Sequence, residues 1–305
     1  MELFQLRYLI AVADAGNFTR ASERNNISQP SLSQQIKNLE SELGIKLFHR
    51  LGRRVVPTEA GQVFLQRVRH ILLEVEDASR ELKDSPTIER RIKVGAVPTL
   101  APYLLPPLIE RCRERYPNLL IHTHEDFRPD LIRGVIDGDL DLAIISQTVN
   151  DPRLSVELLY SEPLLLVVGK GHPLATKFAI VAADLADESF VLLGHTSTLS
   201  NEIERFCGDH NFVPKLGHRC SQVSTVKVLV ALGTGISILP RSAIRPEDQK
   251  DLVYREIGGR VPTREVLVVR HQLRYQTKGA ELFLQMLRNM VAEMPLAGKA
   301  DSLTR

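Results

Sequence analysis

The chain has 305 residues, of which 43% are hydrophobic and 25% charged, a composition that indicates a globular protein of two or three ordinary domains. The formal net charge is only +2, so a basic surface for nucleic acid has to arise locally. The amphipathic N-terminus does not match a signal peptide, and no apolar run is long enough to span a membrane. Three cysteines without metal-ligand spacing suit a reducing compartment, so we expect a cytoplasmic protein without metal, cofactor or membrane partner.

The first sixty residues predict three short helices. Apolar residues at helical spacing predict the first over 3–15, and Thr19 is the expected N-cap of the second, 19–24. Ser28 precedes the third helix, which carries Pro30 in its first turn, where a missing N–H costs little. The apolar stripe of this third helix consists of Leu32, Ile36, Leu39 and Leu43.

The opposite face of the third helix is small and polar, as in the recognition helix of a helix-turn-helix. The residues expected to read base edges are Gln29, Pro30, Ser33 and Gln34. Ser31 and Lys37 are expected to hold the DNA backbone. An ordinary amphipathic helix would show the same stripe, so this helix alone does not establish DNA binding.

Two short strands, 47–49 and 54–56, follow around a turn at Gly52 and predict a wing. The wing carries a basic group suited to phosphate or to the minor groove, namely Arg50, Arg53 and Arg54. A solvated turn could hold these arginines too. The ordered set of helices, cap, polar face and basic wing favours a winged helix-turn-helix over residues 1–58.

Residues 59–88 predict a linker helix and a hinge. Apolar residues repeat there in an a/d heptad pattern made of Phe64, Val68, Ile71, Val75, Ala78 and Leu82. An exposed stripe of this kind needs a partner helix, and the expected partner is a second subunit, which also suits a DNA site with two-fold symmetry. The alternative is that the stripe packs back on its own domain.

Residues 89–305 alternate strands and helices, which predicts an α/β domain with a mainly parallel sheet. Its length favours two lobes, lobe I over 89–163 and 269–305 and lobe II over 164–268, with segments 163–169 and 265–271 crossing between them. The expected strands are 92–97, 119–125, 141–146, 155–160, 163–169, 189–194, 217–221, 236–240 and 265–271. The expected helices are 103–116, 129–137, 199–209, 224–232 and 277–292.

Several strands end in hydroxyl-bearing residues where helices begin. Ligands of open α/β sheets bind beyond the carboxyl ends of strands, and helix N-termini offer free N–H groups. The candidate effector-binding residues are Thr99, Gln147, Thr196, Ser197, Thr198 and Ser224. Each hydroxyl can also be an ordinary N-cap. As a set they predict a site for a small polar or anionic effector.

The segment ISQPSLSQQIKNLESELGIKLFHRLGRRVVPTEAG resembles the LysR-type transcriptional regulators, and the resemblance extends over nearly the whole chain. It implies a winged helix-turn-helix that binds double-stranded promoter DNA, a dimerising linker helix and a two-lobed effector domain similar to periplasmic binding proteins. It also implies a homodimer, commonly paired into a homotetramer. In that family the residue matching Thr99 commonly contacts the ligand.

The segments GAVPTLAPYLLPPLIE and ALGTGISILP, with Phe206–Cys207, resemble the peroxide-sensing OxyR-like branch of that family. That branch senses oxidant with two cysteines nine residues apart. Cys207 matches the second of them, but Thr198 stands at the first, and a hydroxyl cannot form a sulfenic acid there. Peroxide sensing is therefore not transferred, and a thiol-redox regulator, with Cys207 and Cys220 as a rearranged pair, stays the alternative.

Enzyme motifs are weak or missing. The lone GxG at 233–235 lacks the context of a dinucleotide site, and His122 and His124 have no evident third metal ligand. A periplasmic solute-binding protein would share the C-terminal architecture but not the helix-turn-helix and wing. The sequence thus predicts a regulator that is not an enzyme.

Overall fold

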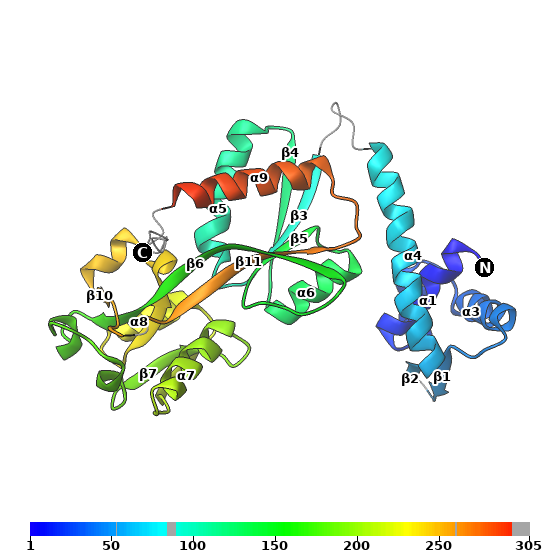
Figure 1. Cartoon of the computed structure of the whole chain (residues 1–305). Coiled ribbons are helices and arrows are strands. Elements are labelled where there is room, and N and C mark those ends of the chain that lie inside the picture. Colours follow the sequence, from blue (N-terminus) through cyan, green and yellow to red (C-terminus); the bar gives the residue numbers. More distant parts are fainter. Residues whose placement is uncertain (53, 84–89, 260, 295–305) are drawn as a thin grey trace, which may run out of the picture. The chain divides into compact units, whose positions relative to one another are not determined.

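The computed structural model describes residues 1–52, 54–83, 90–259 and 261–294 and divides into two compact units, Met1–Ser85 and Pro86–Arg305 (Figure 1). Among these residues, no helix combines the length and the apolar character that a membrane crossing requires. Each unit has its own hydrophobic core, and the second unit has two.

The first unit contains the expected helices and hairpin. Its elements are α1 Leu3–Ala15, α2 Phe18–Arg24, α3 Gln29–Leu43, β1 Phe48–Leu51, β2 Arg54–Pro57 and α4 Glu59–Lys83. Ser28, which precedes the third helix as expected, is the N-cap of α3, and its hydroxyl accepts from the backbone N–H of Ser31 at 3.3 Å. The prediction that Thr19 caps α2 is wrong. Asn17 is the N-cap, and its Oδ1 accepts from the N–H groups of Thr19 and Arg20, because the helix begins one residue earlier.

The core of the first unit contains apolar residues of α3 and of the N-terminal half of α4. Leu32, Ile36 and Leu39 are fully buried there, whereas Leu43 at the end of the stripe is exposed. Val68 of α4 is buried in the same core, and Phe64 packs against it. The first part of the predicted heptad stripe therefore packs within its own domain and is not available for a second subunit. The reason is that α4 packs against α1 and against β2 of the wing.

The second unit is α/β and contains one long sheet and a short one. Its strands are β3 Arg90–Ala96, β4 Leu119–Glu125, β5 Leu142–Ser146, β6 Leu154–Gly169, β7 Ser189–Leu193, β8 Lys215–Cys220, β9 Ser237–Pro240, β10 Leu252–Arg255 and β11 Thr263–His271. Its helices are α5 Ala101–Arg115, α6 Arg128–Asp137, α7 Thr198–Asp209, α8 Val223–Ala231 and α9 Lys278–Glu293. The expected strands 155–160 and 163–169 are one continuous strand, β6.

The long sheet has the order β10-β6-β11-β5-β3-β4, with β9 also paired to β6. It is mixed and not mainly parallel as predicted: β3 runs parallel to β4 and β5, but β11 is antiparallel to both β5 and β6. β7 and β8 form a separate parallel pair. The reason is that β6 and β11 are long connections that leave lobe I and return to it, so they have to run in opposite directions (Figure 1).

The two cores of the second unit define two lobes, and β6 and β11 pass through both. Lobe I centres on β3, β4 and β5, and lobe II on β7, β8 and α7. Leu164 is the first residue of the lobe II core along β6, where the crossing was expected. On β11, Val266 already belongs to the lobe I core. The chain therefore returns to lobe I before Val266, whereas lobe II was expected from the sequence to extend to residue 268.

Candidate DNA-binding face and effector cavity

The start of α3 presents a polar surface to solvent. The exposed residues on this surface are Gln29, Pro30, Ser31, Gln34 and Lys37. The buried apolar stripe on the opposite face of α3 packs into the core and holds the helix in place. The Gln34 amide donates to Asn38 Oδ1 at 2.9 Å, one turn later on the same face. This bond limits the rotamers of Gln34 while leaving donors and acceptors free for a base edge.

Ser33 differs from the other predicted base readers, because its side chain is only 8% exposed. Its hydroxyl accepts from Arg50 Nη2 at 3.2 Å. The Arg50 guanidinium also lies over the ring of Phe18, 4.5 Å from its centroid. Ser33 and Phe18 therefore orient the first basic residue of the wing.

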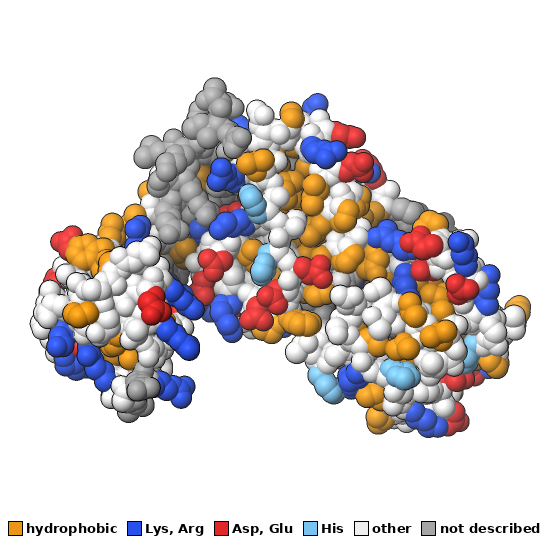
Figure 2. Space-filling model, turned by 180° about the vertical axis from the view of Figure 1, so that it is seen from behind, with side chains coloured by type: hydrophobic (Ala, Val, Ile, Leu, Met, Phe, Trp, Pro, Cys, Tyr) orange, Lys and Arg blue, Asp and Glu red, His pale blue; other side chains and the backbone are white. Residues whose placement is uncertain are grey.

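Two wing arginines, Arg50 and Arg54, are exposed on the hairpin, and Arg53 lies outside the described residues. Figure 2 shows Lys and Arg side chains at the lower end of the first unit, where Figure 1 places β1 and β2. Cations on a projecting hairpin are placed to contact phosphate. The wing therefore supplies a basic surface on the unit that also presents the polar face of α3.

Sequence reasoning missed the residue that joins α3 to the wing. Glu40 is buried, and its carboxylate accepts from the N–H groups of Leu47 at 2.9 Å and Phe48 at 3.3 Å and from Lys46 Nζ at 2.9 Å. The burial of Glu40 could have been recognised from its position, because it stands four residues after Ile36 on the apolar side of the helix. A buried carboxylate with three donors sets the angle between helix and hairpin.

Part of α4 keeps an apolar surface. Ile71 and Val75 are 38% and 37% exposed, unlike Val68 one turn earlier. The side chain of Leu82 lies outside the described residues. The face available for self-association along α4 thus begins after Val68.

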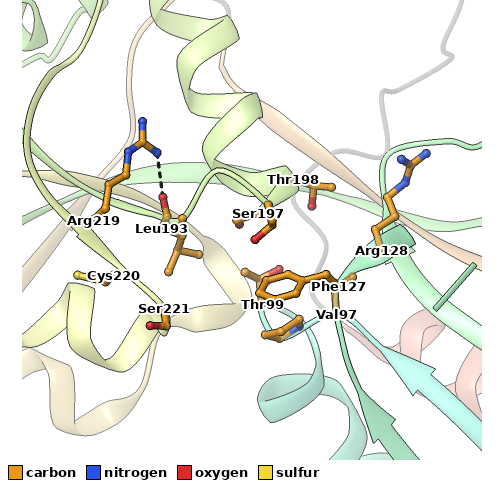
Figure 3. A pocket seen from close by; sticks show the side chains of 13 residues that line it. Val97, Thr99, Phe127, Arg128, Leu193, Ser197, Thr198, Arg219, Cys220 and Ser221 are labelled. Carbon is orange, nitrogen blue, oxygen red and sulfur yellow. Dashed lines mark hydrogen bonds between the residues drawn. The ribbon is translucent and has the colours of Figure 1, made fainter. Parts of the chain in front are cut away.

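A cavity of about 350 Å³ lies between the two lobes of the second unit (Figure 3). Lobe I contributes Val97, Pro98, Thr99, Phe127 and Arg128, and lobe II contributes residues 193–194, 196–198 and 219–221. Thr99, Phe127 and Ser197 gather in the middle of the view, with Arg128 and Arg219 on opposite sides. The cavity has the size of a small-ligand site.

Hydrogen-bond donors dominate the polar groups of the cavity. Arg264 donates to Thr99 Oγ1 at 3.2 Å and to the Thr99 carbonyl at 3.3 Å, so the Thr99 hydroxyl keeps its own proton to donate. Ser197 is the N-cap residue of α7, is 9% exposed, and its Oγ has no hydrogen-bond partner among the described residues. The N-terminus of α7 adds free N–H groups. A ligand oxygen that accepts hydrogen bonds matches these groups.

Both arginines of the cavity are anchored. Arg128 Nη2 donates to the Thr148 carbonyl at 2.5 Å. Arg219 donates to the Leu193 carbonyl at 3.2 Å and to Glu204 Oε1 at 3.0 Å. Both guanidiniums are therefore held in place, and the charge of Arg219 is paired with that of Glu204.

Four of the six predicted effector residues line the cavity, namely Thr99, Thr196, Ser197 and Thr198. Gln147 lies behind the wall, where its amide donates to the Thr198 carbonyl at 3.4 Å, and Ser224 is exposed and bonds to Gln222. Sequence reasoning missed Phe127, Arg128 and Arg219 as lining residues. Arg128 carried a signal, since it opens a helix directly after strand β4.

The three cysteines are unpaired and buried. Burial raises the pKa of Cys112 to about 11 and that of Cys207 to about 12. Cys220 is on the cavity wall, and burial raises its pKa as well. Thiols in such surroundings stay protonated at neutral pH and are poor nucleophiles.

Comparisons with known proteins match both units. The family described as "Bacterial regulatory helix-turn-helix protein, lysR family" matches residues 3–62, and the "LysR substrate binding domain" matches residues 87–292. The dual regulator OxyR of Escherichia coli K12 is 34% identical over 260 residues, 83% of this chain and 84% of its own. The Hca operon activator HcaR of the same organism is 33% identical over 270 residues, 88% of this chain and 91% of its own.

Solved structures match over almost the full length. A cysteine-to-aspartate variant of full-length OxyR from Pseudomonas aeruginosa superposes with a TM-score of 0.72 and 28% identity, covering 97% of this chain and 96% of that one. Full-length BenM superposes with a TM-score of 0.60 and 29% identity, covering 96% and 97%.

Proposed function

Because the chain belongs to the LysR family of bacterial transcriptional regulators, we propose that α3 and the wing read promoter DNA and that the inter-lobe cavity binds the effector. The protein is a LysR-type DNA-binding transcriptional regulator with an α/β effector-binding region. The observation that carries the residue assignment is the exposed polar start of α3 above a fully buried stripe.

The base readers are Gln29, Pro30 and Gln34, and Ser31 and Lys37 hold the DNA backbone. Their exposure along one face of α3 supports these roles. The burial of Ser33 favours a supporting role, in which it holds Arg50 toward phosphate. Arg54 adds a second phosphate contact, and Arg53 belongs to the same proposal by its place in the sequence.

The effector is a small anion, and a carboxylate fits best. The unpartnered Ser197 hydroxyl, the donor left on Thr99 and the start of α7 all favour an acceptor oxygen. The Arg128 guanidinium, which is bonded to the Thr148 carbonyl, favours negative charge in the same space, whereas the charge of Arg219 is paired with Glu204. Thr196 and Thr198 complete the wall, whereas Gln147 supports Thr198 from behind and Ser224 takes no part.

The protein acts as a homodimer that pairs into a homotetramer, in line with the family resemblance. The exposed Ile71 and Val75 of α4 support self-association at that helix. It works in the cytoplasm, where promoter DNA lies, without cofactor and without an enzymatic activity, since the curated relatives that it resembles are regulators.

A thiol-redox regulator is the second candidate, because the chain resembles OxyR. The burial of Cys207 and the raised pKa of its thiol argue against this candidate. Thr198 at the other position bonds through its hydroxyl to Ser146 at 2.6 Å. The effector-binding function therefore has the better support.

A thermal-shift screen of small mono- and dicarboxylates on the full chain tests the effector site. A bound compound raises Tm by mass action. Ser197→Ala should reduce that rise, and it breaks no hydrogen bond among the described residues. Ser224→Ala, which removes a hydroxyl outside the cavity, is the matched control. If Ser197→Ala and Ser224→Ala both keep the full rise, the cavity assignment is wrong.

A further inference from the structure

A small polar contact joins the two lobes directly behind the effector cavity. At the end of β5 in lobe I, the hydroxyl of Ser146 lies 2.6 Å from that of Thr198 at the start of α7 in lobe II. The next residue, Gln147, donates to the Thr198 carbonyl at 3.4 Å, and Glu202 follows one turn further along α7. We call these four residues the β5–α7 contact.

The backbone within this contact is strained. Gln147 has φ 65°, in the left-handed region that residues with a side chain rarely adopt. Such a conformation costs free energy and persists where the surroundings hold it. Here the Gln147 side chain is bonded to the Thr198 carbonyl at the start of α7. A change that lifts the start of α7 away from β5 breaks this bond and lets the backbone of Gln147 relax.

Glu202 is the titratable member of the contact, and one of its carboxyl oxygens is unsatisfied. Oε2 is buried and has no hydrogen-bond partner among the described residues. Three charged groups face the carboxyl: Arg264 from β11, Glu162 from β6 and Arg205 from α7 itself. The Arg264 guanidinium donates to Glu162, Thr99 and Ser242, and its charge is paired mainly with the Glu162 carboxylate and not with Glu202.

Glu202 also borders a hollow of about 170 Å³ on another side of α7, together with Arg205, Asp209 and His210. This hollow gives water and protons a route to the carboxyl group. Burial raises the pKa of Glu202 to about 7, against the opposing pull of Arg264, Gln147 and Arg205. Near neutral pH, both the protonated and the ionised forms are therefore populated.

We infer that Glu202 makes the β5–α7 contact respond to pH. The protonated carboxyl fits the buried position, whereas the ionised form leaves a charged oxygen without a donor. Lifting the start of α7 away from β5 hydrates that oxygen, so ionisation loosens the contact and proton uptake tightens it. Because Thr198 also lines the cavity, closure of the cavity takes up a proton; this last step rests on the proposed effector site.

The contact is tested on the full chain without ligand or DNA, so its outcome is independent of the proposed function. The variants are Glu202→Gln and, as a matched control on the same helix, Asp209→Asn at an exposed acid. Carbon-13 NMR of the side-chain carboxyls should show one glutamate with a midpoint near pH 7, absent only from Glu202→Gln. A Glu202 midpoint near pH 4.5 overturns the inference.

Amide hydrogen exchange, corrected for the intrinsic rate at each pH, measures the contact itself. Protection at the first turn of α7 should fall several-fold between pH 6 and pH 8 in the wild type and in Asp209→Asn. It should stay constant in Glu202→Gln. Equal protection at both pH values in the wild type, or the same fall in Glu202→Gln, shows that Glu202 does not control the contact.

Discussion

Arg264 and Thr99 lie 165 residues apart in the chain, yet the guanidinium of Arg264 donates to both the hydroxyl and the carbonyl of Thr99. The same guanidinium pairs with Glu162, directly opposite on β6, at the point where both long strands pass between the lobes. Arg264 is fully buried and also donates to Ser242 of lobe II. Its guanidinium therefore connects Thr99 on the wall of the inter-lobe cavity with β6 and with lobe II.

Arg264→Met should destabilise the second unit strongly. It leaves the Glu162 carboxylate buried without its partner, which typically costs about 3–5 kcal/mol. Urea unfolding of the full chain, followed by a probe in the second unit, measures the loss. Arg288→Met removes an exposed pair with Glu157 and should cost at most about 1 kcal/mol. Similar small losses for both variants would contradict the structural role of Arg264.

Gln34→Ala should weaken specific DNA binding by about 1–3 kcal/mol and leave binding to random DNA almost unchanged. The reason is that the exposed Gln34 amide offers a donor and an acceptor to one base edge. Titration of a labelled promoter fragment and of a random duplex at one salt concentration gives both affinities. Gln66→Ala, at an exposed glutamine of α4, is the control. Equal losses on both duplexes would exclude base reading by Gln34.

Arg54→Ala should lower affinity for every duplex and reduce the salt slope by about one. Arg54 is exposed on the wing, where its charge can displace counterions from phosphate. Affinities measured from low to physiological salt give the slope. Arg7→Ala, at an exposed arginine of α1, should leave the slope unchanged. A slope that is the same in wild type and Arg54→Ala removes this residue from the interface.

The Cys207 thiol should be almost inert in the native protein. Because burial raises its pKa from 9.0 to about 12, its thiolate fraction at pH 8 is about a thousandfold below that of an ordinary cysteine. Mass spectrometry after brief treatment with iodoacetamide measures the reaction, and the urea-unfolded chain is the control. Fast native labelling, or a reversible Cys207–Cys220 disulfide after peroxide, would restore the thiol-redox alternative.

Much of the local structure was predictable because short-range spacing encodes it. The stripe of α3, the Ser28 cap and the strand over 119–125 all follow from patterns within one element. The hydroxyls that gather at the cavity were predictable for a related reason. Ligand sites of α/β folds lie beyond the carboxyl ends of strands, and Thr99 and Ser197 follow the ends of β3 and β7 in different lobes.

Only the tertiary structure decided which residues meet across long distances in the chain. Val68 fits a dimer seam by its spacing but is buried in the hydrophobic core of its own unit. Folding places the charged side chains of Glu40 and Arg264 in buried polar contacts, and it buries Oε2 of Glu202 without a partner among the described residues. The physical reason is that periodicity records which face of an element is apolar, whereas the partner of a buried charge comes from another element.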